Sequence, residues 1–319
     1  MASERQITVG NVKIGGGAPV VVQSMTLTKT HDVEATTAQI AALASAGCEI
    51  VRVAVPKTED ALALPRIVRL SPIPVIADIH FNASLALKAI EAGVHAVRIN
   101  PGNIGGPDKV AMVVQAAKKA GIPMRVGANS GSLPKHLHDL ARRDQAEALV
   151  AAALEEVELL ERLGFYDFKI SVKSSHVPTM IRAYRMLAAK VPYPLHLGVT
   201  EAGPPFSGAI KSAVGMGALL MDGIGDTLRV SLTADPVEEV KVAWEILKAL
   251  GLRERGPVLI ACPSCGRDNV GVEKLAAQVE ERLGGYRESF EVAVLGCAVN
   301  GPGEAGDADF GIAGGRDVG

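Results

Sequence analysis

Residues 227–233 read Thr227-Leu-Arg229-Val-Ser231-Leu-Thr233, and this stretch decides the fold prediction. Polar and apolar side chains alternate along it, which is typical of a β-strand with one polar and one apolar face. Glycines precede it, and a helical pattern of apolar residues follows it. The same unit, a β-branched run followed by a helical pattern, occurs seven times before it.

Eight runs are therefore predicted as strands. They cover residues 20–26, 50–56, 74–80, 96–101, 124–129, 168–174, 195–200 and 227–233. Eight strand–helix units in about 230 residues predict a (β/α)8 TIM barrel, an α/β fold. A doubly wound open sheet is the alternative, but no G-x-G-x-x-G motif for a dinucleotide follows the first run. Two short runs at residues 7–14 predict a β-hairpin that plugs the barrel.

The composition predicts a globular cytoplasmic protein. The chain has 319 residues, of which 48% are hydrophobic and 21% charged, enough for one large domain and one small one. A net charge of -2 favours neither nucleic acid nor an anionic membrane as a partner. The sequence contains no run of 18 apolar residues, so no membrane span is predicted, and the polar N-terminus lacks a secretory signal pattern. We therefore expect reduced cysteines.

Charged side chains occupy inward-facing positions of the predicted strands. Five strands each supply a permanent cation: Arg52, Arg98, Arg125, Lys173 and Arg229. One such cation could be structural, paired with Asp78 or Glu201, but several unpaired cations would each cost several kcal/mol to bury. We therefore expect an anionic ligand with several charges, best a diphosphate. The neutral binding candidates are Asn100, Asn129, Thr200 and Ser231.

Three of the four cysteines are gathered near the end of the chain. They stand in Ala-Cys262-Pro-Ser-Cys265-Gly-Arg and in Leu-Gly-Cys297-Ala-Val-Asn-Gly-Pro-Gly-Glu304. A Cys-x-x-Cys pair with a distant third thiolate has metal-ligand spacing, but no histidine follows His196 to complete a zinc site. The shortage favours a 4Fe-4S cluster with three thiolates, and Glu304 is the nearest carboxylate for the fourth iron. A zinc site with a remote ligand, or ordinary buried thiols, are the alternatives.

Residues 251–256 predict a linker between a barrel of residues 1–250 and a cluster domain of residues 257–319. The last helix of the barrel runs antiparallel to the strands, so it ends opposite the expected ligand site. The linker spans at most about 20 Å, roughly the length of that helix. We therefore expect a head-to-tail homodimer in which the cluster of one subunit covers the barrel of the other.

Together the motifs resemble the 4-hydroxy-3-methylbut-2-enyl diphosphate synthases of the non-mevalonate isoprenoid pathway. The resemblance covers nearly the whole chain and rests on motifs that include Val97-Arg98-Ile-Asn100-Pro-Gly, Arg125-Val-Gly-Ala-Asn129-Ser-Gly, His196-Leu-Gly-Val-Thr200-Glu201-Ala-Gly and Cys262-Pro-Ser-Cys265-Gly-Arg. Chains of this family usually continue by several tens of residues beyond the run at 311–315. We therefore expect the small domain to be incomplete in this sequence.

The resemblance implies an iron-sulfur oxidoreductase. It reductively opens 2-C-methyl-D-erythritol 2,4-cyclodiphosphate and removes a hydroxyl to give 4-hydroxy-3-methylbut-2-enyl diphosphate. Its 4Fe-4S ligands would be Cys262, Cys265, Cys297 and Glu304. The candidate proton donors are, in order, Glu304, His80 and Glu201. Because no nucleotide motif is present, we expect ferredoxin or flavodoxin to deliver the electrons.

Two other classes of function remain open from the residues alone. A non-redox barrel lyase or transferase on a phosphorylated substrate, with a structural zinc, would explain the cations and the Cys-x-x-Cys pair. A protein that only transfers electrons or carries a cluster would explain the cysteines but not the charged barrel.

Overall fold

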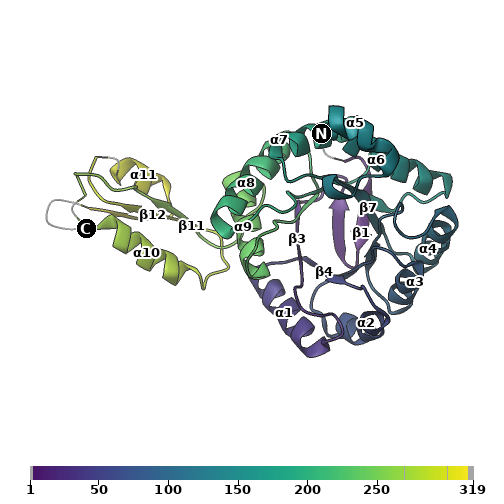
Figure 1. Cartoon of the computed structure of the whole chain (residues 1–319). Helices are drawn as coiled ribbons and strands as arrows, with labels where there is room; N and C mark the ends of the chain where they lie inside the picture. Colours follow the sequence, from purple (N-terminus) through teal and green to yellow (C-terminus); the bar gives the residue numbers. More distant parts are fainter. Residues whose placement is uncertain (1–2, 269, 300, 315–319) are drawn as a thin grey trace. The chain divides into compact units, whose positions relative to one another are not determined.

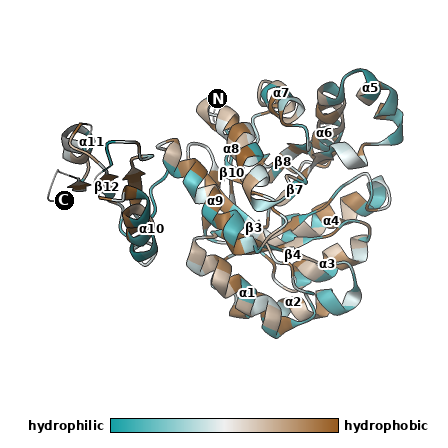
Figure 2. Ribbon diagram, turned by 60° about the vertical axis from the view of Figure 1, so that its left-hand side comes forward, coloured by the Kyte–Doolittle hydropathy of each residue, from teal (hydrophilic) through white to brown (hydrophobic). Residues whose placement is uncertain are grey.

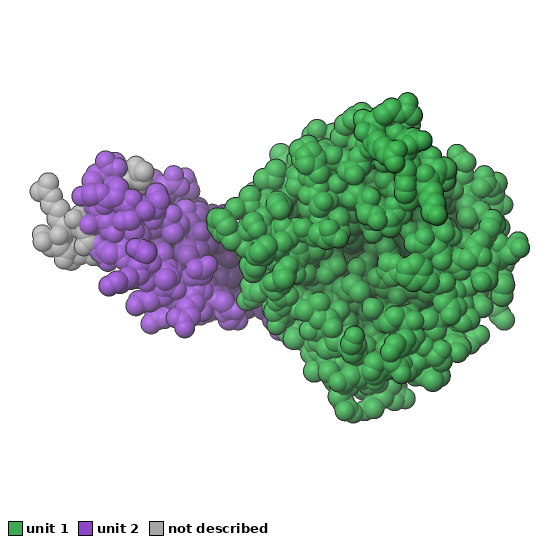
Figure 3. Space-filling model, viewed as in Figure 1, with its two compact units in different colours: residues 1–252 green, residues 253–319 purple. Residues whose placement is uncertain are grey.

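The computed structural model describes residues 3–268, 270–299 and 301–314 (Figure 1). It divides into two compact units, Met1–Leu252 and Arg253–Gly319, coloured separately in Figure 3. The division falls within the segment predicted as a linker. The first unit thus holds the predicted strand–helix repeats, and the second holds the three clustered cysteines.

The first unit is a barrel of eight parallel strands, which confirms the predicted fold (Figure 1). In spatial order the strands are β8 (Phe168–Lys173), β7 (Met124–Asn129), β6 (Ala96–Arg98), β5 (Val75–Asp78), β4 (Ile50–Ala54), β3 (Val21–Met25), β10 (Thr227–Leu228) and β9 (His196–Leu197). A single bridge between Ile170 and Leu195 joins β8 to β9. The Ile170 N–H also donates to the Pro194 carbonyl at 2.9 Å, so the two ends of the sheet meet.

Helices form a ring around the strands (Figure 1). They are α1 (Val33–Ala46), α2 (Thr58–Leu70), α3 (Ala83–Glu91), α4 (Pro107–Ala120), α5 (His138–Arg143), α6 (Gln145–Arg162), α7 (Val177–Ala188), α8 (Pro205–Met221) and α9 (Pro236–Ala249). Local sequence sets several of their ends. Side-chain oxygens of Asp32, Asn82 and Asp144 accept from the first turns of α1, α3 and α6, as expected of N-caps. Gly47 and Gly121 end α1 and α4 in the left-handed conformation.

Alternation along each strand separates an apolar face from a polar one. On β4, Val51 and Val53 are fully buried in the core shared with the helices, while Arg52 between them points into the lumen. The hairpin of β1 (Gln6–Val9) and β2 (Val12–Gly15) packs against a lower lumen layer. That layer consists of Val21, Ile50, Ile76 and Ala96. The predicted plug is therefore confirmed, and a polar interior rests on an apolar base.

The last strand of the barrel is shorter than predicted. The sequence predicts a strand over residues 227–233, but β10 ends at Leu228. Beyond it the backbone finds other partners: the Leu232 N–H donates to Glu239 Oε1 at 2.9 Å, and the Thr233 N–H donates to the Gly203 carbonyl at 3.0 Å. Ser231 therefore lies on a loop after the strand. Thr200 likewise follows β9, which ends at Leu197 rather than at residue 200.

The second unit contains a three-stranded parallel sheet. Its strands are β11 (Val258–Ala261), β12 (Glu291–Leu295) and β13 (Phe310–Ala313), in that order, accompanied by α10 (Val272–Leu283) and α11 (Gly301–Asp307). The strands are brown in Figure 2, the colour of hydrophobic residues, and Val292 and Val294 of β12 pack with Val272 of α10 in the small apolar core. Residues 315–319, which include the end of the last predicted run, lie outside the described residues.

Within the described residues, no helix has the length and apolar character needed to cross a bilayer. All four cysteines lie in the described part of the chain, and none of them forms a disulfide.

Candidate active site

A buried carboxylate joins two of the predicted cations at the carboxyl ends of the strands. Asp78 Oδ1 accepts from Arg98 Nη1 at 2.9 Å, and Asp78 Oδ2 lies 3.3 Å from Arg52 Nε. Burial alone would raise the pKa of Asp78, but the charges of Arg52 and Arg98 outweigh it and lower that pKa to about 2. From the sequence, both arginines are expected to be free for a ligand, but they share one acid. Part of their positive charge is therefore neutralised within the fold, as the alternative of a structural ion pair proposed.

His80 extends this network toward solvent. Arg98 Nη1 donates to His80 Nε2 at 2.5 Å, and the His80 side chain is about half exposed. Burial and the charge of Arg98 lower the pKa of His80. A neutral imidazole with one face open to solvent can accept or pass a proton at the barrel mouth.

A second carboxylate, which the sequence analysis missed, neutralises Arg229. Glu239 on α9 is buried, and its Oε1 lies 3.2 Å from Arg229 Nη2. The same carboxylate accepts from Ser24 Oγ and from the Leu232 N–H. An acidic residue on the apolar face of the last helical pattern, one position before Val240, was the signal in the sequence that could have revealed it.

Two of the predicted cations contact no carboxylate among the residues described. Arg125 donates to Ser171 Oγ at 2.5 Å, while its Nε and Nη1 are buried without a partner in the described structure. No hydrogen bond or ion pair of Lys173 is found within the described ranges, and its ammonium lies over Gly198, where an added Cβ would stand 2.6 Å from Nζ. Burial and the neighbouring arginines lower the pKa of Lys173 well below its usual value. These two residues are the clearest candidates for an anion site.

The neutral candidates differ in what they can offer a ligand. Asn129 Oδ1 is buried and lacks a partner within the described residues. Asn100 Oδ1 accepts from the Gly102 N–H at 3.0 Å, so that oxygen already holds a turn. Thr200 and Ser231 are half-buried on the loops after β9 and β10. Glu201, also on the loop after β9, is exposed and has a left-handed backbone, with φ of 53°.

Glu156 on α6 is another acid that the sequence analysis missed. Its Oε2 is buried without a partner among the described residues, and the carboxylate receives a backbone hydrogen bond from Gly127 on β7. Burial raises the pKa of Glu156 to about 8, although Arg98 and Arg125 act in the opposite direction. Its position in the middle of an amphipathic helix gave no sign that this carboxylate is buried.

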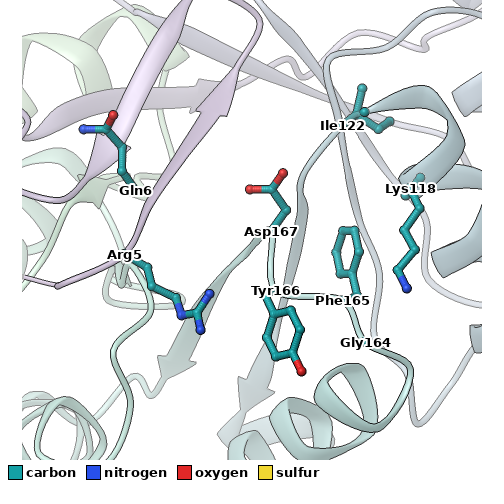
Figure 4. A pocket seen from close by; sticks show the side chains of 10 residues that line it. Arg5, Gln6, Lys118, Ile122, Gly164, Phe165, Tyr166 and Asp167 are labelled. Carbon is teal, nitrogen blue, oxygen red and sulfur yellow. The ribbon is translucent and has the colours of Figure 1, made fainter.

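A hollow of about 400 Å³ lies at the opposite end of the barrel (Figure 4). It is lined by residues that precede β7 and β8, and the Arg5 guanidinium lies 5.1 Å from the centre of the Tyr166 ring. Active sites of TIM barrels lie at the carboxyl ends of the strands, so this hollow is not the candidate active site.

The cysteines of the second unit follow the carboxyl ends of neighbouring strands. Cys262 directly follows β11, and its N–H donates to the Val294 carbonyl at 3.1 Å. Cys297 follows β12, and its carbonyl accepts from Gly301 at the start of α11. Between Cys262 and Cys265, Ser264 has a left-handed backbone with φ of 64°. The topology therefore places all three thiols at the same edge of the sheet.

Glu304 lies on α11 and is exposed. In the described part of this unit, no three side chains of histidine, cysteine, aspartate or glutamate are close enough to hold one metal ion. The donor set itself, three thiols and a carboxylate around one sheet edge, has the chemistry of a cluster site. The assignment of these four residues as ligands remains a prediction.

Family models match the chain in both units. The model described as the GcpE TIM-barrel domain matches residues 4–244, and the model described as the GcpE protein C-terminal domain matches residues 258–319. The chain belongs to the GcpE family. The resemblance stated from the sequence motifs is thereby confirmed. Members of the GcpE family carry a 4Fe-4S cluster.

Similar curated GcpE-family proteins are named 4-hydroxy-3-methylbut-2-en-1-yl diphosphate synthase (flavodoxin). The protein of Maridesulfovibrio salexigens is 58% identical over 99% of this chain and 88% of its own length. The protein of Geobacter sulfurreducens is 58% identical over 100% of this chain and 90% of its own. The predicted class, an oxidoreductase, agrees with these relatives.

Solved structures with a similar fold are far less similar in sequence. A 3-dehydroquinate dehydratase from Geobacillus kaustophilus is 15% identical, with a TM-score of 0.55 over 78% of this chain and 99% of that one. A dihydropteroate synthase from Yersinia pestis is 14% identical, with a TM-score of 0.53 over 78% and 100%. At such identity the likeness concerns the barrel fold alone.

Proposed function

We propose that this chain is a 4-hydroxy-3-methylbut-2-enyl diphosphate synthase, which reductively opens 2-C-methyl-D-erythritol 2,4-cyclodiphosphate and removes a hydroxyl. One observation carries the proposal beyond family membership. The barrel of this GcpE-family chain buries Arg125 and Lys173 without a carboxylate partner in the described structure, while Asp78 and Glu239 serve the other arginines. A buried surplus of positive charge favours a ligand with several negative charges, such as a cyclic diphosphate.

The lumen residues would bind and orient this substrate. Arg125 and Lys173 supply charge for the diphosphate, and Arg52, Arg98 and Arg229 direct their remaining N–H groups at it from positions fixed by Asp78 and Glu239. The neutral contacts would come from Asn100, Asn129, Thr200 and Ser231. Fixed donors in a dry lumen stabilise charge on the substrate without reorganising during the reaction.

Cys262, Cys265 and Cys297 are the proposed thiolate ligands of a 4Fe-4S cluster, and Glu304 is the proposed fourth ligand. When bound, the cluster supplies one-electron transfers and a Lewis-acidic iron. Ligation requires deprotonated thiols, and solvent reaches all three: Cys265 is exposed, and Cys262 and Cys297 are partly buried.

Protons for the departing hydroxyl would come from carboxyl or imidazole groups of this chain. Glu304 is the first candidate, followed by His80 and then Glu201. His80 is open to solvent on one side and hydrogen-bonded to Arg98 on the other, an arrangement that allows it to be reprotonated between turnovers.

Electron donor and assembly belong to the same proposal. Because similar relatives are named with flavodoxin, we propose flavodoxin as the donor rather than ferredoxin.

We also propose the head-to-tail homodimer expected from the short linker, in which each cluster serves the barrel of the partner. Sedimentation of the active enzyme tests the dimer, since a fully active monomer at high dilution excludes it.

Anaerobic purification of the full chain tests the function. We expect about four iron and four sulfide per chain and conversion of the cyclic diphosphate with reduced flavodoxin. Stoichiometric zinc in a colourless protein would support the lyase alternative instead, and iron without affinity for cyclic diphosphates would support the carrier alternative.

The variant Glu304→Gln tests the assigned carboxylate. We expect it to retain iron but to lose turnover by about 10²-fold or more, because a neutral amide cannot donate the proton. Glu280→Gln, the same change at an exposed site on α10 of the same unit, should keep full activity. Full turnover by Glu304→Gln would remove the residue from the mechanism.

A further inference from the structure

The lower part of the barrel lumen holds a polar layer that the proposed function does not use. Gln23 on β3, Lys169 on β8 and His196 on β9 are 1%, 1% and 0% exposed. Their strand neighbours, Val22, Ile170 and Leu197 among them, lie in the core outside the barrel. Because side chains alternate along a strand, all three residues point into the lumen.

Strand register connects this layer to the arginine network above. Asp78 pairs with Arg98, Arg98 with Arg125, and Arg125 with Lys169, across the four neighbouring strands β5 to β8. This row contains three cations and one acid, and the acid stands at the end farthest from Lys169. Below it lies the apolar base formed with the hairpin. The polar layer, whose Lys169 is also the last member of this row, is therefore a floor between the arginines and the apolar base.

The floor and the adjacent Arg125 present several hydrogen-bonding atoms that have no partner in the described residues. These atoms are Gln23 Nε2, Arg125 Nε, Arg125 Nη1 and His196 Nε2. Other polar atoms of the floor have partners: Lys169 Nζ donates to Gln23 Oε1 at 3.1 Å, and His196 Nδ1 lies 2.6 Å from Thr227 Oγ1. Each buried unpaired donor costs about 1–3 kcal/mol. Gln23 Nε2, Arg125 Nε and Arg125 Nη1 are donors, and such a group of fixed donors calls for a ligand rich in acceptors.

Charge distinguishes the kind of ligand. Water would satisfy the donors but would leave the positive charges uncompensated, whereas an anion satisfies both. Burial, followed by the charges of Arg125 and Arg52, lowers the pKa of Lys169 to about 7, and Asp226 opposes this only in part. Neither His196 on β9 nor Lys173, which lies on β8 with Lys169, supplies a negative charge.

We propose that Lys169, Gln23 and His196 form a deeper part of the anion site, a floor that binds phosphate oxygens of a diphosphate group together with Arg125. The identity of the full substrate rests on the proposed function, but the floor itself requires only a diphosphate. An anion there favours the charged form of Lys169, so binding at pH 8 takes up as much as about one proton per chain.

Calorimetric titration with inorganic pyrophosphate at pH 8, in two buffers of different ionisation enthalpy, tests the floor. The full-length protein is compared with Lys169→Met, and Lys88→Met on the exposed face of α3 is the matched control. We expect Lys169→Met to bind pyrophosphate about tenfold or more weakly and to lose the extra proton uptake. Lys88→Met should behave like the parent protein.

Thermal stability separates a binding role from a structural one. Without a ligand, Lys169→Met should melt about 4 °C or more higher, because a desolvated cation without an acid is replaced by an apolar side chain. A lower melting temperature with unchanged pyrophosphate affinity would mean that Lys169 only braces the barrel, which overturns the proposal.

The variant Gln23→Glu gives an independent test. It supplies Lys169 with a carboxylate at the position of the present amide, so we expect higher stability and weaker pyrophosphate binding. Unchanged binding in this variant contradicts the floor. These measurements need neither electrons nor turnover. If the protein has synthase activity but Lys169→Met binds pyrophosphate as tightly as the parent protein, only the floor is refuted. If Lys169→Met binds pyrophosphate more weakly but the parent protein has no synthase activity, only the proposed function is refuted.

Discussion

The two halves of the barrel wall treat buried positive charge in opposite ways. On the half that runs from β6 through β5, β4 and β3 to β10, arginines contact buried carboxylates: Arg52 and Arg98 share Asp78, and Arg229, just after β10, contacts Glu239. On the half built from β7, β8 and β9, Arg125, Lys169 and Lys173 contact no acid among the described residues.

This difference indicates which half of the barrel wall an anionic ligand stabilises most. A neutralised pair is stable without a ligand, and removing either member leaves an uncompensated charge. Cations without an acid weaken the empty protein and are stabilised only when an anion arrives. The first half is therefore expected to support the fold and to orient its arginines, whereas the second half is expected to supply binding energy.

The largest effect is expected from breaking the neutralised half. Asp78→Asn removes the acid shared by two buried arginines, so the free energy of unfolding should fall by about 3–5 kcal/mol. Denaturant unfolding measures this loss. The same change in Asp139→Asn, at a pair with Arg142 in which both side chains are about four-fifths exposed, should cost less than about 1 kcal/mol. Equal effects at the two sites would refute the contrast.

A change in the other half should reverse the pattern. Lys173→Met removes a cation that lacks an acid in the described structure, so stability without substrate should hold or rise. Its kcat/KM for the cyclic diphosphate should fall by about 10–100-fold, the value of a charged hydrogen bond. Arg229→Met provides the comparison, because it leaves Glu239 unpaired and should lower stability. A stability loss in Lys173→Met as large as in Arg229→Met would erase the distinction between the halves.

The smallest effect concerns pH and Glu156, which lies behind β7. Its pKa is raised from 4.5 to about 8, so between these values the folded protein binds a proton that the unfolded chain does not. Stability conferred by this group is therefore present below about pH 4.5 and is lost as pH rises to about 8. Glu156→Gln should flatten this decline in thermal unfolding, while Glu158→Gln, at an exposed pair with Arg162 on the same helix, should not. An unchanged slope in Glu156→Gln would show that the carboxyl is ionised in the fold.

Most of the barrel was predictable because its signals are local. β-branched runs with glycine at their ends, repeated eight times, specify strands and turns without reference to the rest of the chain. The hairpin plug followed from two alternating runs about Gly10. The length of β10 was not predictable, because the Leu232 N–H takes its partner from Glu239 rather than from a neighbouring strand.

The sequence by itself determined the eight-unit barrel, the family and the set of inward cations, because side-chain alternation and motif spacing are properties of neighbouring residues. Only the tertiary structure decided which cations are neutralised. Asp78 reaches Arg52 and Arg98 from a strand between theirs, and Glu239 reaches Arg229 from a helix behind the sheet. Contact between charges depends on strand register and helix packing, which bring distant residues within a few ångströms. A local sequence pattern does not specify such distances.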